Sequence, residues 1–284
     1  MIVDFRGRPP TPEYLTYFGP DRTRWIGERV GARSMSQAFL EGSLELFFEE
    51  MNEAGIDYTV ALGRNSPEML LGERRFPAGI IPNKHVLVLQ TRYPDRVVGM
   101  AGVDVSNQIH DAVAEIDEFV GQCGLKGVFV EPQRALPGQP DDAAVMPVYE
   151  KCLEYGVPVS IMSGPFAGPD IGYTDPRHID AVATRYPDLN IIAGHGAWPY
   201  VTEIIAVAFK HPNVYVSPDI YHFVPGSEGY VTAANGFMAD QLLFGTAYPI
   251  RPLKQTVEDF KALPFEPDAL TKALGLNAQR LLGL

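Results

Sequence analysis

The stretch "IVDFRGRPP", residues 2–10, decides between the two α/β folds that the chain can adopt. Its first residues form a mainly apolar run typical of a buried strand, and Arg6 and Arg8 follow directly. A doubly wound open sheet is expected to carry a glycine-rich phosphate-binding turn after its first strand. Gly7 is the only glycine in this stretch, which therefore favours a closed barrel over an open sheet.

Seven further runs of similar character follow along the chain, with stretches of helical periodicity between them. Most of the runs are continuously apolar, as expected of parallel strands that are covered on both faces. Eight strand–helix units in 284 residues predict a single (β/α)8 TIM barrel spanning residues 1–284. The predicted strands are residues 2–5, 57–63, 97–103, 126–130, 158–162, 190–194, 214–217 and 242–245.

Two long loops, residues 9–34 and 64–82, follow the first and second predicted strands. In a TIM barrel such connections lie at the carboxyl ends of the strands, where the active sites of these barrels are found. The residues at this end are therefore the candidates for function. Taken strand by strand, they are Asp4, Arg6, Arg8, Arg64, Asp104, Glu131, Met162, Ser163, His195, Asp219, His222, Ala247, Tyr248 and Arg251.

The composition excludes several classes of protein. The formal net charge is −12 and no run of lysines and arginines occurs, which argues against a nucleic-acid partner. Cys123 and Cys152 form no CxxC pair, so both are expected to be free thiols in a reducing compartment. The sequence shows neither a signal peptide nor an apolar segment long enough to span a bilayer. We therefore expect a cytoplasmic protein without a membrane partner.

Several stretches, taken in chain order, resemble the amidohydrolase-related family, which includes aminocarboxymuconate-semialdehyde decarboxylase and other aromatic-acid decarboxylases and hydrolases. The resemblance covers nearly the whole chain and implies a TIM barrel, an enzyme and a homo-oligomer, often a dimer. The matching stretches are "MNEAGIDYTVALG" (51–63), "IPNKHVLVLQTRYPDRVVGMAGVDV" (81–105), "GLKGVFVEP" (124–132), "RYPDLNIIAGHGAWP" (185–199), "HPNVYVS" (211–217), "LLFGTAYP" (242–249) and "LGLNAQRLLGL" (274–284).

The chain departs from this family at most of the metal-ligand positions that the resemblance implies. Arg6 and Arg8 stand where the family has an HxH pair, Met162 replaces a histidine, and Ala247 replaces an aspartate. His195 is retained. Arginine is permanently protonated and offers no lone pair to a cation. The sequence therefore predicts no metal and no other cofactor. A substitute metal site would have to be built from His195, Asp219, His222 and Glu131.

The arginines at the strand ends predict a site for an anion. Guanidinium groups bind carboxylates through two parallel hydrogen bonds, and they would reverse the local sign of charge in an acidic protein. Arg6 and Arg8, joined by Arg64 and Arg251, are expected to bind a small carboxylated substrate. The alternative is that the first two arginines only pair with nearby aspartates, namely Asp4, Asp104 or Asp219.

His195 and Asp219 are the predicted catalytic residues. His195 lies between two glycines, and histidine is the side chain best suited to proton transfer near neutral pH. Asp219 is expected to orient His195 or to act as a base, unless it only pairs with an arginine. Met162, Trp198 and Tyr248 are expected to line the pocket, with ordinary core packing as the alternative for each.

These observations predict a metal-independent hydrolase that acts on a small carboxylated ring or lactone. Hydrolysis is the expected reaction because many members of the resembling family are hydrolases. Decarboxylation is the alternative within the family. A catalytically inactive barrel that binds a small acid is the alternative from another class.

Overall fold

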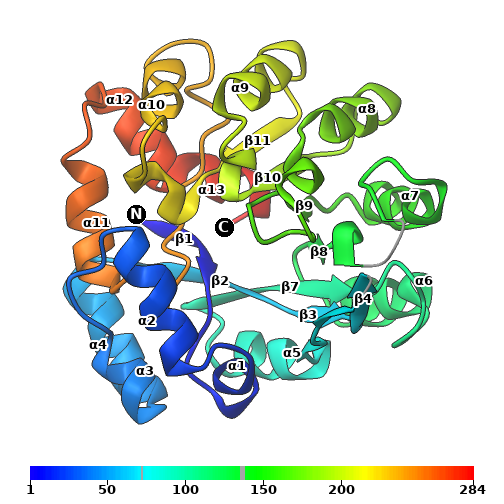
Figure 1. The fold of residues 1–284 in the computed structure, drawn as a ribbon. Coiled ribbons are helices and arrows are strands. Elements are labelled where there is room, and N and C mark those ends of the chain that lie inside the picture. Colours follow the sequence, from blue (N-terminus) through cyan, green and yellow to red (C-terminus); the bar gives the residue numbers. More distant parts are fainter. Residues whose placement is uncertain (72, 135–137) are drawn as a thin grey trace.

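A curved parallel sheet forms the centre of the molecule (Figure 1). The computed structural model describes residues 1–71, 73–134 and 138–284. The strands follow one another around the sheet in chain order, with all neighbours parallel, as expected of βα units. They are β1 (Val3–Gly7), β2 (Tyr58–Leu62), β7 (Val97–Val103), β8 (Val128–Val130), β9 (Val159–Met162), β10 (Ile191–Gly194) and β11 (Val214–Ser217).

The segment 242–244 occupies the eighth position and closes the sheet into a barrel. Leu242 forms a parallel bridge with Val216 of β11, and the amide of Leu243 donates to the carbonyl of Val216 at 2.9 Å. On the other side, the amide of Phe5 in β1 donates to the carbonyl of Phe244 at 2.9 Å. The predicted TIM barrel is confirmed, although its eighth segment is too short and irregular to be a regular strand.

Helices surround the barrel (Figure 1). Gly55 and Gly156 end two of them in the left-handed conformation, with φ angles of 71° and 62°. The helices are α1 (Pro12–Tyr17), α2 (Pro20–Arg29), α3 (Gln37–Glu41), α4 (Leu44–Ala54), α5 (Asn83–Arg92), α6 (Ala112–Ile116), α7 (Met146–Tyr155), α8 (Arg177–Arg185), α9 (Val201–Lys210), α10 (Glu228–Ala234), α11 (Leu253–Lys261), α12 (Pro267–Thr271) and α13 (Asn277–Leu282). Shorter helical turns are η1 (Asp117–Gln122), η2 (Pro132–Arg134), η3 (Ala143–Val145), η4 (Ile171–Thr174), η5 (His195–Ala197), η6 (Asp219–Phe223) and η7 (Lys272–Leu276).

None of the helices within residues 1–71, 73–134 and 138–284 combines the length and the apolar composition that crossing a bilayer requires.

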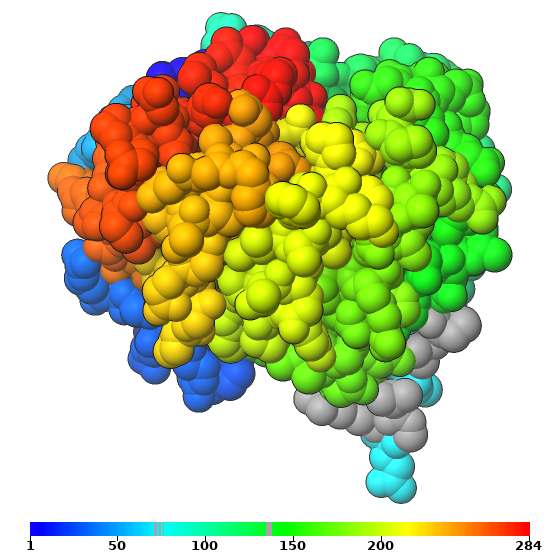
Figure 2. Space-filling model, turned by 90° about the horizontal axis from the view of Figure 1, so that it is seen from above, coloured from blue at the N-terminus to red at the C-terminus, as the bar shows by residue number. Residues whose placement is uncertain are grey.

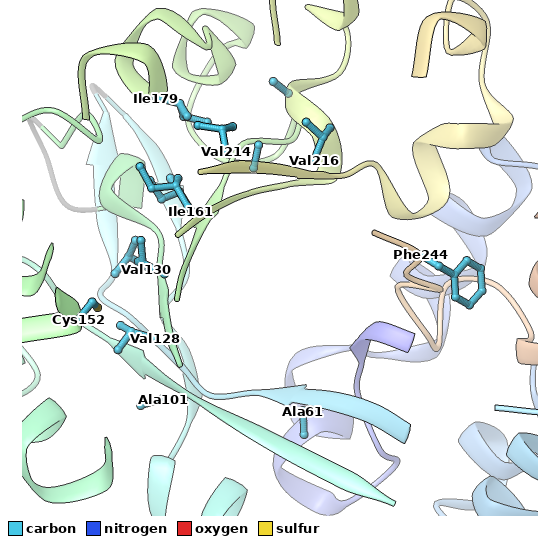
Figure 3. Close-up of a cluster of buried hydrophobic side chains, with 14 of the residues drawn as sticks. Ala61, Ala101, Val128, Val130, Cys152, Ile161, Ile179, Val214, Val216 and Phe244 are labelled. Atoms are coloured by element: carbon cyan, nitrogen blue, oxygen red, sulfur yellow. The ribbon is translucent and has the colours of Figure 1, made fainter. Parts of the chain in front are cut away.

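The strands bury side chains on both faces, which explains their continuously apolar sequences. Side chains that point into the barrel form one cluster, which includes Phe5, Val60, Met100 and Phe129. Side chains that point outward pack against the helices in a second cluster (Figure 3). Its members drawn and labelled there are Ala61, Ala101, Val128, Val130, Cys152, Ile161, Ile179, Val214, Val216 and Phe244.

Additional structure lies over the carboxyl ends of the strands. The segment 9–34 contains α1 and α2, and the segment 64–82 contains β3 (Arg64–Ser66), β4 (Met69–Leu71), β5 (Arg74–Phe76) and β6 (Gly79–Ile81). Strand β3 pairs with β6 and β4 pairs with β5, both antiparallel. Figure 2 shows the blue N-terminal segment and the cyan hairpin segment on the same side of the molecule.

Candidate active site

The carboxyl ends of β1, β9, β10 and β11 bring the candidate residues together. Arg6 lies in β1, Met162 ends β9, and His195 follows β10 directly. Asp219 begins η6, two residues after β11. His195 and Asp219 both adopt positive φ angles, 66° and 56°, which non-glycine residues rarely do. Backbone strain of this kind is concentrated at functional sites.

His195 and Asp219 form a buried pair. Nδ1 of His195 lies 2.8 Å from Oδ2 of Asp219, a hydrogen-bonding distance, although the angle does not meet the criterion for a regular hydrogen bond. Ser217 Oγ donates to Oδ1 of Asp219 at 2.7 Å and so fixes the carboxylate. Asp219 is fully buried and His195 is 5% exposed. These contacts hold the carboxylate of Asp219 in one orientation beside His195.

The charges in this pair are set by burial and by Arg6. Burial lowers the pKa of His195 to about 4, and the positive charge of Arg6 adds to this effect. Burial alone would raise the pKa of Asp219, but its contact with His195 and the charge of Arg6 hold it below the ordinary value. At neutral pH the pair is thus a neutral imidazole beside an ionised carboxylate. The carboxylate favours the tautomer with its proton on Nδ1, which leaves the lone pair of Nε2 free.

Arg6 contacts the His195–Asp219 pair. Its Nε lies 3.6 Å from Oδ2 of Asp219, and its Nη2 donates to the sulfur of Met162 at 3.3 Å. Its guanidinium carbon also lies 5.1 Å from the centre of the Phe129 ring. The expectation that an arginine pairs with Asp219 therefore holds for Arg6. This contact supplies the carboxylate with a positively charged neighbour.

Arg64 has a different acidic partner. Its Nη2 donates to Oε1 of Glu131 at 2.6 Å, and its guanidinium carbon lies 4.1 Å from the centre of the Tyr17 ring. The other oxygen of Glu131 accepts a hydrogen bond from Ser66. This network joins β3 to the end of β8, so Glu131 neutralises one of the three site arginines.

Arg8 is held by backbone carbonyls instead. Its Nη1 donates to the carbonyls of Ala247 and Tyr248 at 2.9 and 3.1 Å. Its guanidinium carbon lies 4.4 Å above the Phe18 ring. The side chain is buried, and burial together with the charge of Arg6 lowers its pKa to about 9. Arg8 therefore remains a cation at neutral pH.

A narrow pocket of about 40 Å³ opens above these residues. Side chains of α1, α2 and the 163–170 connection line it together with the strand ends. The residues lining the pocket are Arg6, Arg8, Tyr17, Phe18, Arg22, Ile26, Arg64, Met162, Phe166, His195, Ile220, Tyr221 and Ile250. The structure thus brings five of the predicted site residues to one pocket: Arg6, Arg8, Arg64, Met162 and His195. Asp219 lies directly behind His195.

Three of the predicted substrate-binding residues lie elsewhere. Trp198 stacks on Tyr221 with ring centres 5.4 Å apart, one layer behind the pocket. Tyr248 is fully buried, and its hydroxyl shares a hydrogen bond of 2.7 Å with Ser36. Tyr248 therefore serves the site only through its carbonyl, because the turn at Ala247 directs its side chain into the helical layer. The structure places the side chains of both aromatic residues outside the lining of this pocket.

Arg251 is also a structural residue. It is 1% exposed, forms an ion pair with Asp259 of α11 and donates to the carbonyl of Val30. Its guanidinium carbon lies 3.9 Å from the Phe223 ring. Proximity in sequence to the eighth segment placed Arg251 at the mouth in the prediction. The chain turns away before this residue, so Arg251 joins α2 to α11 instead.

The remaining strand-end candidates have local partners. Asp4 accepts hydrogen bonds from the amide and the hydroxyl of Thr246 at 2.7 and 2.8 Å, which ties β1 to the eighth segment. Asp104 accepts bonds from the turn at residues 106–109. His222 is buried against the rings of Tyr230 and Phe260. These side chains support the frame of the site.

Several aromatic residues of the site were not predicted from the sequence, among them Phe18 and Phe166, which line the pocket, and Tyr221 and Phe129. Tyr221 packs edge-on against His195 with ring centres 5.3 Å apart, and Phe129 lies beneath Arg6. The alternation of inward and outward side chains in β8 identifies Phe129 as an interior residue. Tyr221 lies in η6, where no strand periodicity applies.

Comparison with known proteins decides the family. The amidohydrolase family model matches residues 48–284, more than half of the chain. The chain belongs to the amidohydrolase family. A solved structure of an uncharacterised TIM-barrel protein from Bordetella bronchiseptica is 41% identical in sequence to this chain and superimposes on it with a TM-score of 0.90. The match covers 99% of this chain and 98% of the Bordetella chain. No functionally curated protein matches the chain.

More distant structures share the fold alone. A 2,6-dihydroxybenzoate decarboxylase from Rhizobium is 17% identical to this chain, with a TM-score of 0.67. The match covers 99% of this chain and 98% of the decarboxylase. A 5-carboxyvanillate decarboxylase from Novosphingobium aromaticivorans, solved with bound manganese, is 15% identical with a TM-score of 0.67, over 100% and 97% of the two chains. The named relatives are enzymes of several reaction types, including a hydratase.

The donor set of this amidohydrolase-family member does not fit a metal ion of the kind bound in the manganese structure. Arg6 and Arg8 place two guanidinium groups at the carboxyl end of β1, and Met162 and Ala247 offer no hard ligand. Across residues 1–71, 73–134 and 138–284, no group of three or more histidine, cysteine, aspartate or glutamate side chains is placed to hold a metal. Asp219 contacts a guanidinium where a cation would need its oxygen.

Proposed function

We propose that the protein is a metal-independent hydrolase that acts on a small carboxylated substrate with an ester or lactone bond. The observation that carries the proposal is the neutral His195, backed by ionised Asp219, in a pocket lined by four arginines. A neutral imidazole with a free Nε2 can accept a proton from water, and the ionised Asp219 offsets the weaker basicity that burial gives this histidine. The arginines supply the positive charge that the negatively charged intermediate needs.

In the proposed reaction, Nε2 of His195 removes a proton from water while the water oxygen attacks the carbonyl carbon. Asp219 stabilises the imidazolium that forms, as the aspartate of a catalytic triad does. Arg6, which lines the same pocket, stabilises the oxygen that becomes negative, because the imidazolium then balances the charge of Asp219. The carbon–oxygen bond of the ester then breaks, and the imidazolium returns its proton to the departing oxygen. The products are a carboxylic acid and an alcohol, so atoms and protons balance.

Decarboxylation is the second candidate, favoured by the two aromatic-acid decarboxylases that share the fold. That reaction releases carbon dioxide and needs a proton donor for the carbon that is left behind. Burial keeps the pKa of His195 near 4, so the protonated form is scarce at neutral pH. The site therefore supports a base-catalysed hydrolysis better than a step that begins with an acid.

Turnover by the purified protein, treated with a chelator, tests the proposal. We expect hydrolysis of at least one member of a set of carboxylated lactones, and a loss of roughly a hundredfold or more in kcat for His195→Ala. His178→Ala is the matched control, because His178 contacts Asp141 on the outside of the barrel and leaves the pocket intact. Carbon dioxide released from aromatic acids would instead support the decarboxylase. Binding of such acids without any turnover would leave only an inactive barrel.

A further inference from the structure

Four arginines line the pocket, and three of them, Arg6, Arg8 and Arg64, are buried or half-buried. These three differ in how their charges are balanced. Arg6 lies beside Asp219, and Arg64 donates to Glu131. Arg8 has no acidic partner among the residues that the structure describes, and it is only 7% exposed. Two of the positive charges are thus already neutralised by protein carboxylates. One buried positive charge is left over.

An unbalanced buried charge is costly, because the surrounding protein cannot replace the water that the ion loses. Two carbonyls bind Nη1 of Arg8, but they carry only partial charges. In the part of the chain that the structure describes, neither Nε nor Nη2 of Arg8 has a hydrogen-bond partner, and neither is sealed from the pocket. These two groups form one edge of the guanidinium, which is the edge that grips a carboxylate with two parallel bonds.

We infer that the ligand of this pocket carries a single carboxylate and that Arg8 binds it. The inference rests on the proposed function and adds to it the number of charges on the substrate and the residue that selects it. A second carboxylate inside the pocket would meet Arg6 and Arg64, whose charges are already balanced, and would remain buried without a counterion. Arg22 also lines the pocket but is exposed to solvent, so an ion pair between it and a second carboxylate would add little to the binding free energy.

Small probes of different charge test the number of charges. The monoamide of malonate has nearly the size of malonate but a single charge, so it separates the effect of charge from that of size in the narrow pocket. The probes are acetate, malonate, its monoamide and neutral acetamide, added at constant ionic strength to the full chain while its melting temperature is measured. A ligand that binds the folded state raises that temperature. We expect acetate and the monoamide to raise it, malonate to raise it less than the monoamide, and acetamide to leave it unchanged. Malonate stabilising the protein more than its monoamide would overturn the inference, as would the absence of any acetate effect.

Substitutions at two arginines of the same pocket test the assignment to Arg8. Arg8→Gln should abolish the acetate effect, whereas Arg22→Gln should preserve it. Arg8→Lys keeps the charge and loses the two-pronged edge, so its acetate effect should need about a tenfold higher concentration. This variant keeps the assignment testable where Arg8→Gln does not fold. An acetate effect that survives unchanged in Arg8→Gln would overturn the assignment. If only Arg8→Lys folds, an unchanged acetate effect in that variant would overturn it.

The outcome is separable from that of the proposed function. An enzyme that hydrolyses a dicarboxylated lactone faster than the matching monocarboxylated one would sustain the proposed function and overturn this inference. A chain that binds acetate through Arg8 but hydrolyses no lactone would sustain the carboxylate site and overturn the proposed reaction.

Discussion

His195 owes its proposed role as a base to its surroundings. The residue is buried beside Asp219 and in the field of Arg6, and both burial and the arginine disfavour the protonated ring. The ionised carboxylate of Asp219 favours the protonated ring, but it also contacts Arg6, whose positive charge partly balances it. The balance leaves a neutral imidazole whose free nitrogen has access to the pocket.

This balance predicts an unusual titration. The pKa of His195 is about 4, whereas an ordinary histidine titrates near 6.5. Because its pKa in the folded protein is lowered, His195 stays neutral as the pH falls from 8 to about 5 and protonates only below that. Carbon-13 NMR of the imidazole carbons measures this directly, with His195→Gln identifying the signal. A midpoint near 6.5 would contradict the expected neutral base.

An irregularity in β1 directs the arginines of the site. Val3 and Phe5 point into the barrel, so strict alternation would turn Arg6 outward. The pairing of β1 with β2 shifts register between Asp4 and Gly7, and such a bulge changes the direction of the following side chains. Arg6 and Arg8 consequently both face the pocket. The irregularity in the strand is therefore part of the site.

Gly7 allows the backbone of β1 to lie close to the side chains of Thr59 and Asp4. A methyl group at this position is therefore expected to destabilise the strand. A Cβ on Gly7 would lie 1.8 Å from Oγ1 of Thr59 and 3.2 Å from a carboxylate oxygen of Asp4. Gly7→Ala should therefore lower the free energy of unfolding by about 1–3 kcal/mol. Urea unfolding followed by circular dichroism measures the loss. Gly236→Ala is the control, because only the carbonyl of Ala233 lies near, at 3.7 Å, and an unchanged stability in both variants would contradict the steric argument.

At the scale of the molecule, closure of the barrel depends on a segment without regular strand structure. Residues 242–244 connect β11 to β1 through backbone hydrogen bonds, and Asp4 adds two bonds to Thr246. Closure brings Asp219 and Ala247 to the same end as Arg6 and Arg8. The charge pairs of the site therefore exist only when the first and last parts of the barrel meet.

Phe244 anchors this closure, and its truncation is expected to weaken the whole molecule. The side chain, labelled in Figure 3, is 1% exposed. It packs against Phe260 of α11 with ring centres 4.8 Å apart. Phe244→Ala should cost about 3–5 kcal/mol in the free energy of unfolding. Phe237→Ala is the matched control, because Phe237 is 51% exposed and loses mainly its contact with Phe209. Equal losses in chemical denaturation of the two variants would contradict this role for Phe244.

The sequence by itself determined the order of the strands, the parallel barrel and the residues at most strand ends. These features follow from local patterns, namely apolar runs, helical periodicity and glycines at helix ends. The replacement of family metal ligands by Arg6, Arg8, Met162 and Ala247 was also visible in the sequence. His195 was identified in the same way, because strand ends in a barrel share one face.

The tertiary structure alone decided which charges meet. Arg6 contacts Asp219, which lies 213 positions later in the sequence, and Arg64 contacts Glu131, whereas Arg8 receives only carbonyls. Tyr248 and Arg251 turned out to be buried structural residues because the chain bends at Ala247. Local periodicity carries no information about such partners, since they depend on strand register, on bulges and on the closing of the barrel. The physical reason is that hydrogen bonds and ion pairs are decided by distances of a few ångströms between segments that are remote in the chain.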